Sequence, residues 1–292
     1  MDEVQLADWP PALIQEIAER RCVIVIGAGL SAQSRSAIDG TRPPSWSGLV
    51  ESLAKSCFRR ETPDVIERKI QAGSLLEAIS EIRKFADRQS FDRAMTQILV
   101  DPRFQASESH DHVIELDQQV VISLNFDSIY EDQCTNGDSF LYRVTGPTHG
   151  DLGRHIRGPS KVIYKLHGSI ANPDPIVFGT QDYIRNAQVG NGDLRVIEAL
   201  LLTRTALFIG CGFNGDPDVE LLLESMSKAG GSNYPHFALV RKWEGGGARG
   251  SSSSDAVERI EYGGTPEDPH AYFADSLKEL AHEVRERRRT MG

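Results

Sequence analysis

Two polar residues stand where catalytic groups are common, each soon after an apolar run. Asn125 follows the run 119–123, and His167 follows the run 161–165 with Gly168 beside it to permit close approach. In open α/β sheets, ligands bind beyond the carboxyl ends of the strands, so we expect both side chains at a ligand-binding edge. A histidine there suits a general base, because its ordinary pKa of about 6.5 lets it accept a proton near neutral pH.

Each of these residues also has a structural interpretation. Asn125 could simply turn the chain, and Asp127 could cap the helix that follows it, as aspartate commonly does. A lone histidine is more often structural than catalytic, but the position of His167 after a buried strand favours a functional role. We favour function for Asn125 and keep both interpretations for Asp127.

A glycine-rich turn follows the apolar run 22–26. It consists of Gly27, Ala28, Gly29, Leu30 and Ser31, and Ala32 takes the third glycine position of the dinucleotide fingerprint. Glycines there let the backbone approach a pyrophosphate, and a following helix supplies amide donors. The acidic ribose ligand expected about 20 residues later is missing, since residues 47–53 look helical. The turn indicates a nucleotide but disfavours an ordinary dehydrogenase, and a plain strand-to-helix turn is the alternative.

A second turn with small residues follows the apolar run 206–209. Gly210, Gly212 and Asn214 offer room and backbone amides where a ribose or phosphate could lie. Cys211 is not favoured as a nucleophile, because no histidine is near it in the sequence.

Metal chemistry is not expected. No two of the four cysteines form a CxxC pair, so a structural zinc site is not predicted. The Asp-Pro-Asp sequence at 216–218 is more typical of helix initiation than of metal binding.

Alternating strands and helices must position these residues. The predicted strands are the runs 22–26, 119–123, 161–165, 206–209 and 236–240, with a weaker one at 257–262. Helices are predicted at 127–134, 193–202, 216–228 and 269–288, and the Gly- and Ser-rich segment 244–255 is predicted to be a surface loop. This alternation predicts an α/β fold with a Rossmann-like parallel sheet. Between residues 47 and about 115, apolar residues at three- and four-residue steps predict a helical insertion of three or four helices.

Composition narrows the classes of function. The net charge of -10 disfavours nonspecific nucleic-acid binding, which depends on neutralising phosphates. We interpret the basic run of Arg285 and Arg287–Arg289 as a solvated helix end. Residues 1–8 are acidic and lack the basic start and apolar stretch that a signal peptide has. No apolar run approaches the roughly 20 residues needed to span a bilayer, so we expect a cytoplasmic protein.

In this order, the motifs resemble those of the sirtuin-like NAD-binding family. The matching stretches are 27–31, 125–127, 167–168 and 210–214, and the resemblance runs from about residue 22 to about residue 262. Pro44-Ser-Trp46 with Leu49 also resembles the bacterial branch of the family. By resemblance, Asn125 fixes ribose hydroxyls or the attacking water, and His167 accepts a proton. The other cofactor-binding residues that the resemblance implies are Gly27, Ala28, Gly29 and Ser31 near the pyrophosphate, Asp127, and Gly210, Gly212, Asn214 and Tyr262 on the adenosine side.

The sequence departs from the protein-deacylating members of that family. They carry a zinc module with two cysteine pairs, which this chain lacks, and their aromatic-arginine cofactor loop has Arg42-Pro-Pro44 as its nearest counterpart here. The chain looks more like the bacterial NADases that deplete NAD during phage infection, which implies NAD as substrate, nicotinamide and ADP-ribose as products, and no metal. NAD-dependent deacylation, or a non-catalytic NAD or ADP-ribose sensor, are the alternatives.

The resemblance also bears on assembly. Such proteins act as homo-oligomers, or beside a partner such as a HerA-like ATPase or a short Argonaute. We expect one domain over residues 1–292, because the α/β core and the insertion use nearly the whole length. Regulation is then expected through self-assembly or a separate protein partner, with no direct nucleic-acid or membrane partner.

Overall fold

Five consecutive apolar residues form the central strand, β1 (Cys22–Ile26). Val23 and Val25 face one apolar core of the molecule, and the other three side chains face a second core. A strand in a parallel sheet with helices on both faces needs such an unbroken apolar run. Burial of each large apolar side chain contributes about 1.5–3 kcal/mol, so this run fixes β1 in the interior.

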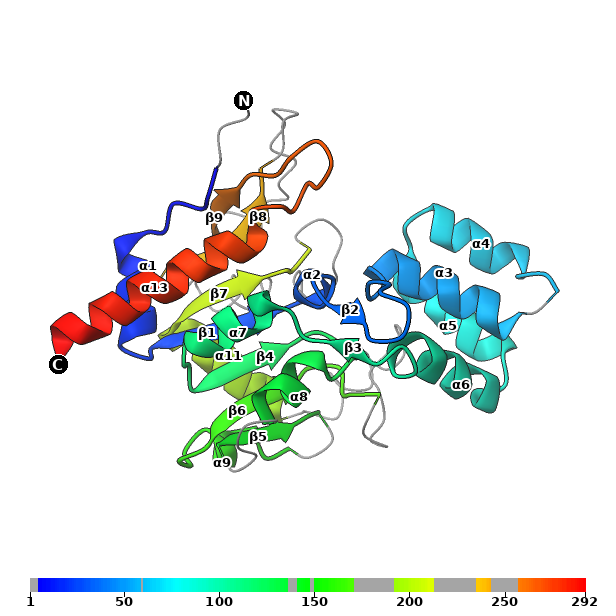
Figure 1. The fold of residues 1–292 in the computed structure, drawn as a ribbon. Helices are drawn as coiled ribbons and strands as arrows, with labels where there is room; N and C mark the ends of the chain where they lie inside the picture. The colour runs from blue at the N-terminus through cyan, green and yellow to red at the C-terminus, as the bar shows by residue number, and fades with distance from the viewer. Residues whose placement is uncertain are drawn as a thin grey trace.

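The computed structural model describes residues 5–58, 60–135, 141–147, 150–170, 192–212, 235–242 and 257–292. Within these residues, seven strands form one sheet in the order β5-β6-β4-β1-β7-β8-β9, and all neighbours in it are parallel (Figure 1). Besides β1, the strands are β4 (Val120–Ser123), β5 (Tyr142–Thr145), β6 (Lys161–Lys165), β7 (Thr205–Ile209), β8 (His236–Arg241) and β9 (Val257–Tyr262).

The predicted Rossmann-like parallel sheet is confirmed. The six predicted strands are present as β1, β4, β6, β7, β8 and β9, with ends that differ by one residue at most. The winding direction changes between β1 and β7, which is where open α/β sheets bind ligands. The edge strand β5 was not predicted, because its residues are partly exposed and form no apolar run. The predicted helix 216–228 and loop 244–255 lie outside the described residues.

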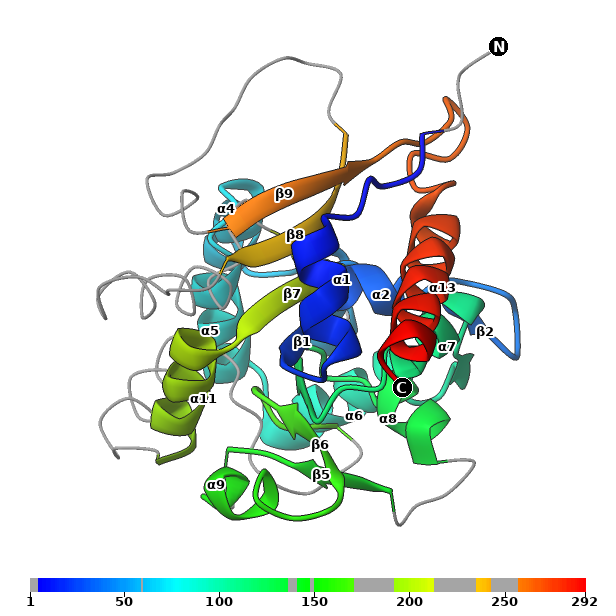
Figure 2. The same cartoon turned by 90° about the vertical axis from the view of Figure 1, so that its left-hand side faces the viewer.

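Helices cover both faces of the sheet (Figure 2). One face carries α1 (Pro11–Ala18), α7 (Glu108–Glu115), α8 (Ile129–Thr135) and α13 (Phe273–Met291), and the other carries α9 (Leu152–His155) and α11 (Gly192–Thr203). Helix α13 confirms the predicted final helix, and its predicted apolar side is buried. Across the described part of the chain, no helix has the length and apolar character needed to cross a bilayer.

The helical insertion packs around an apolar core of its own, on the side toward which β4 and β7 point (Figure 1). Its helices are α3 (Trp46–Cys57), α4 (Asp64–Gln71), α5 (Leu75–Phe85) and α6 (Arg88–Leu99). The side chains of Ser45 and Asp87 accept backbone hydrogen bonds at the starts of α3 and α6, as N-cap residues do. A short antiparallel pairing of β2 (Arg35–Ser36) with β3 (Phe104–Gln105) joins the two ends of this unit. Helix α7 packs instead against α13.

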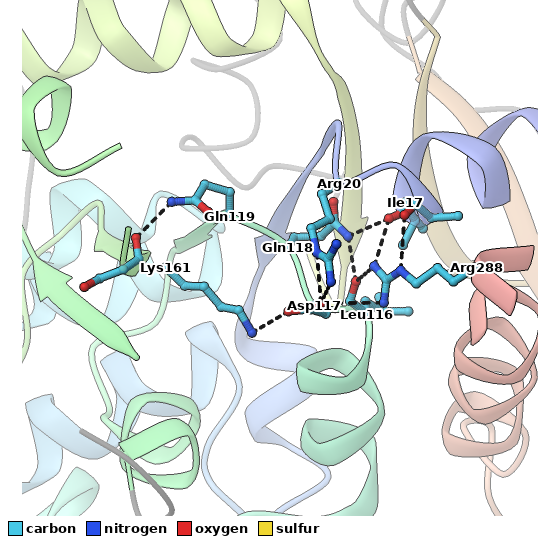
Figure 3. Close-up of polar contacts among 10 residues, drawn as sticks. Ile17, Arg20, Leu116, Asp117, Gln118, Gln119, Lys161 and Arg288 are labelled. Carbon is cyan, nitrogen blue, oxygen red and sulfur yellow. Dashed lines mark hydrogen bonds and ion pairs between the residues drawn. The ribbon is translucent and has the colours of Figure 1, made fainter. Parts of the chain in front are cut away.

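Arg288 connects its own helix, α13, to the carboxyl ends of α1 and α7, beside the amino-terminal ends of the strands (Figure 3). Its guanidinium donates to the carbonyl oxygens of Ile17, Ala18 and Leu116, which end α1 and follow α7. Its Nη1 also lies 3.8 Å from Asp117, which pairs with Arg20 and Lys161. The interpretation of the basic run as a solvated helix end is therefore wrong for Arg288, because the docked helix brings this side chain against carbonyls far away in the sequence.

Replacing Arg288 by alanine is expected to lower the free energy of unfolding by about 1–2 kcal/mol, because charged hydrogen bonds to the carbonyls of buried residues are lost. The neighbouring Arg289 is the matched control, since its side chain is 67% exposed against 23% for Arg288 and pairs with Glu286 on its own helix. Arg289→Ala is expected to change stability by less than about 0.5 kcal/mol. Urea unfolding measures both, and equal effects would contradict the assigned role.

Candidate active site

The loop after β1 packs directly on the loop after β7. The amide of Gly29 donates to the carbonyl oxygen of Gly210 at 2.8 Å, and the amide of Gly27 donates to Ile209 at 3.0 Å. A Cβ atom at Gly27 would lie 2.7 Å from that Gly210 oxygen, so a side chain there would collide with backbone. The helix that follows, α2 (Ala28–Ser31), is a single turn. In this structure, the glycines permit close approach of two loops.

Asn125 links the loop after β4 to the first glycine loop. Its side-chain amide nitrogen donates to the carbonyl oxygen of Gly27 at 3.1 Å and to the hydroxyl of Ser31 at 2.9 Å. Its backbone amide donates to the Ser123 hydroxyl at 3.3 Å. Asn125 is 6% exposed, and these bonds hold it between neighbouring strands β4 and β1. The predicted residues Asn125, Gly27 and Ser31 are therefore brought together.

His167 lies on the other side of the same β4 loop. The amide of Leu166 donates to the carbonyl oxygen of Ser123 at 2.9 Å, and the amide of Ile170 donates to the carbonyl oxygen of Phe126 at 3.0 Å. The loops after β6 and β4 therefore run side by side. The Phe126 and His167 rings have centroids 5.6 Å apart. His167 is 1% exposed. The two predicted catalytic residues thus stand on adjacent loops that contact each other.

Phe126 connects this site to the helical insertion. It belongs to the apolar core of α3–α6, and its ring stacks on Trp46 at 5.9 Å between centroids and 16° between planes. Trp46 lies in the stretch that resembles the bacterial branch, but neither aromatic residue was assigned a function from the sequence. Their contact could not be read from spacing, because 80 positions separate residues 46 and 126.

Asp127 caps the helix after the site loop. One carboxylate oxygen accepts from the amide of Ile129 at 3.1 Å, so the capping interpretation is confirmed for this oxygen. The main-chain carbonyl of Asp127 accepts a hydrogen bond from the ammonium of Lys165, which also pairs with Glu131. Burial raises the pKa of Glu131, and the neighbouring Lys165 opposes that rise. Sequence analysis missed this pair, although a lysine ending an apolar strand was a usable signal.

A second buried histidine, His110, also lies near Asp127. The amide of Ser107 donates to its Nδ1 at 3.2 Å in a capping box at the start of α7. Burial lowers the pKa of His110 to about 4, and the charges of Asp127 and Asp111 oppose that shift. His110 is therefore neutral at physiological pH, with Nδ1 acting as the acceptor.

The remaining predicted residues are spread along the sheet edge. Gly210 stands at the end of β7 beside the first loop, with Gly212 exposed two residues later. The Cys211 thiol contacts backbone carbonyls of β1 and β7, at 3.6 and 3.7 Å. Tyr262 ends the edge strand β9, where its buried hydroxyl lies 2.6 Å from His270 Nδ1. Asn214 lies outside the described residues.

No metal site emerges within the described ranges, where no group of three or more His, Cys, Asp or Glu side chains could hold an ion. The loops that do converge come from β6, β4, β1 and β7, which are neighbours in the sheet. The arrangement offers an amide, an imidazole and glycine-lined backbone at one edge.

Residues 119–259, which include the loops of Asn125, His167 and Gly210, match the family model of the SIR2-like domain. Just under half of the chain is therefore similar to the SIR2-like domain. The NAD(+) hydrolase ThsA of Cytobacillus dafuensis is 25% identical over 257 residues, which is 83% of this chain and 47% of that protein. The chain is also 22% identical over 234 residues to the NAD(+) hydrolase ThsA of Acinetobacter baumannii (strain 532279), covering 79% of this chain and 44% of that one.

The chain therefore spans about half the length of the curated relatives that it matches. Among solved structures, cytosolic 5'-nucleotidase IIIB bound to cytidine aligns over 98% of this chain and 95% of that chain, with 12% identity and a TM-score of 0.41. That similarity is too weak to support an argument about fold or function.

Proposed function

We propose that this chain hydrolyses the nicotinamide–ribose bond of NAD+, releasing nicotinamide and ADP-ribose. The observation that carries the proposal is the contact between the loops of Asn125 and His167 at the carboxyl edge, beside the glycine loop. The names of the two relatives, both NAD(+) hydrolases, support the same substrate and reaction.

The reaction asks little of the protein beyond positioning and proton transfer. The oxygen of water forms a bond to the ribose carbon while the bond from that carbon to the nicotinamide nitrogen breaks. The electron pair of the broken bond leaves with the nicotinamide nitrogen. We assign His167 to accept the proton that the water loses. The Asn125 amide nitrogen is bonded to the glycine loop, so we assign its carbonyl oxygen to orient the water or a ribose hydroxyl. No step requires a metal.

The rest of the dinucleotide would follow the sheet edge. We propose that Gly27, Ala28, Gly29 and Ser31 lie along the pyrophosphate and that Asp127 lies near the nicotinamide ribose. Gly210, Gly212 and Asn214 would contact the adenosine, with Tyr262 farther along. For Tyr262 to take this role, its hydroxyl must keep the hydrogen bond with His270 while the edge of its ring faces the adenine.

The direct test is product analysis. Purified chain incubated with NAD+ alone is expected to yield equal amounts of nicotinamide and ADP-ribose, separated by liquid chromatography. Nicotinamide release that depends on an added acylated peptide would instead establish deacylation, and binding without any product would establish a sensor.

Asn125 and His167 are almost completely buried, so the residues that pack around them are expected to affect activity. Trp46 is one residue whose effect can be measured. Trp46 stacks on Phe126, which contacts the His167 ring, so the insertion supports the residues that cover the site. Trp46→Ala is expected to lower kcat/KM for NAD+ by about five- to tenfold, because one aromatic contact contributes roughly 1–1.4 kcal/mol.

Two controls accompany this measurement. Trp46→Phe keeps a ring on Phe126 and is expected to remain within about threefold of wild type. Phe85→Ala removes an exposed aromatic side chain from the same insertion and is expected to change nothing. A kcat/KM for Trp46→Ala equal to that of Phe85→Ala would rule out support of the site through Phe126.

We further propose that the activity serves anti-phage defence by NAD depletion and is controlled by assembly. An NADase that is always active would harm its own cell, so a control is needed. The stacking of Trp46 on Phe126 gives the insertion a physical route to the site. A homo-oligomer formed through α3–α6 fits this route, and a HerA-like ATPase or a short Argonaute would be the partner in a mixed assembly.

A further inference from the structure

Lys165 is a buried charge at the end of an otherwise apolar strand. In β6, Val162 and Tyr164 face one core, while Ile163 and Lys165 lie on the opposite face of the strand. The Lys165 side chain is 2% exposed. A buried ammonium destabilises the folded state unless it is paired and hydrogen-bonded. The partners of Lys165 therefore indicate what its charge does.

Both partners belong to the junction between the site loop and α8. The ammonium donates to the main-chain carbonyl of Asp127 and pairs with the carboxylate of Glu131, which is 5% exposed. The Asp127 side chain caps Ile129 in the same turn. Asn125 lies two residues before Asp127, and its own side chain is bonded to the first glycine loop. The segment 125–127 is therefore held at both ends.

We propose that Lys165 is a positioning residue, whose ammonium fixes the Asp127 carbonyl and thereby aligns Asn125 for reaction beside His167. The catalytic part of this inference rests on the proposed function, because it takes Asn125 as the residue that orients the reacting groups. Lys165 precedes His167 by two residues. The same short segment therefore carries the His167 imidazole and the ammonium that holds the loop of Asn125.

The ion pair and the carbonyl contact can be separated by substitution. Glu131→Gln removes the negative partner and keeps the Lys165 contact with the Asp127 carbonyl, whereas Lys165→Met removes both. Because Lys165→Met leaves a buried carboxylate without its cation, the double variant Lys165→Met/Glu131→Gln provides a form without that penalty. Lys161→Met is the matched control, since Lys161 lies on the same strand and face but pairs with Asp117 at the opposite edge.

The experiment measures kcat and KM per folded molecule, with nicotinamide release as the assay. Lys165→Met and the double variant are expected to lose about 10- to 100-fold in kcat, with KM within about threefold, because misplacing a reacting group costs rate more than binding. Lys165→Arg, which keeps a charged donor, is expected to recover most of that loss. Wild-type kcat in the double variant, or an equal loss in Lys161→Met, would overturn the proposal.

A second measurement does not depend on turnover. In hydrogen–deuterium exchange, the amides of Ile129 and Ile170 report on the order of the 125–127 segment, because they donate to Asp127 and Phe126. The double variant is expected to exchange at least about tenfold faster at these amides, and Lys161→Met to match wild type there. Unchanged exchange in the double variant would overturn the positioning role. If the double variant exchanges faster but the wild-type chain releases no nicotinamide, Lys165 keeps its positioning role and the proposed NADase activity is wrong.

Discussion

Replacing His167 or Asn125 by alanine is expected to lower kcat for nicotinamide release by about 10²- to 10⁴-fold. His167→Ala removes the group assigned to accept the proton of water. Asn125→Ala removes the assigned orienting oxygen together with the hydrogen bonds to Gly27 and Ser31, so it is also expected to lower stability. Initial rates at saturating NAD+, corrected for the folded fraction, measure both effects.

His155→Ala is the control for loss of an imidazole. His155 lies in α9, partly exposed, with its Nε2 2.7 Å from an Asp151 oxygen on the far side of the sheet from α8. It is expected to keep the wild-type kcat. If both His167→Ala and Asn125→Ala keep more than half of the wild-type kcat, the residue assignment is wrong.

Gly210→Ala is expected to destabilise the protein by about 3 kcal/mol or more, since backbone strain and overpacking each cost about 1–3 kcal/mol. Gly210 has φ +67°, and a Cβ atom there would lie 2.3 Å from the amide nitrogen of Leu30. The two loops would have to separate, and the hydrogen bond from Gly29 to the Gly210 carbonyl would be lost. NAD+ turnover is expected to fall together with stability.

The matched control is Gly73→Ala. Gly73 has a similar φ of +74°, but a Cβ atom there would meet nothing within 4 Å. Its substitution is expected to cost only the left-handed backbone penalty of about 1–2 kcal/mol. Urea unfolding of both variants isolates the effect of the loop contact, and equal losses of stability would show that the contact is unimportant.

The fold followed from sequence because its signals are local. The apolar runs of β1 and β4 are typical of strands buried on both faces, and the turns after them indicated the edge where ligands are expected. Strand β5 lacked that signal, since it lies at the edge and half of its residues are exposed. Likewise, α7 continued the helical pattern of the insertion, and only its packing on α13 separates it.

The site was predictable only in part. Asn125 and His167 follow strands, so their positions could be inferred from topology alone. Lys165, His110 and Trp46 acquire their settings from contacts with residues that are far away in the sequence. Arg288 shows the same limit, because the four neighbouring arginines of the last helix look alike in sequence, and only the fold brings one of them against three carbonyls.

The most direct test of a shared site is a crystal structure of His167→Ala with unhydrolysed NAD+. We expect one dinucleotide along the carboxyl edge, with its nicotinamide ribose about 3–3.5 Å from the Asn125 side chain and facing the position vacated by the imidazole. NAD+ bound at another surface, or a ribose contacted by only one of the two loops, would contradict it.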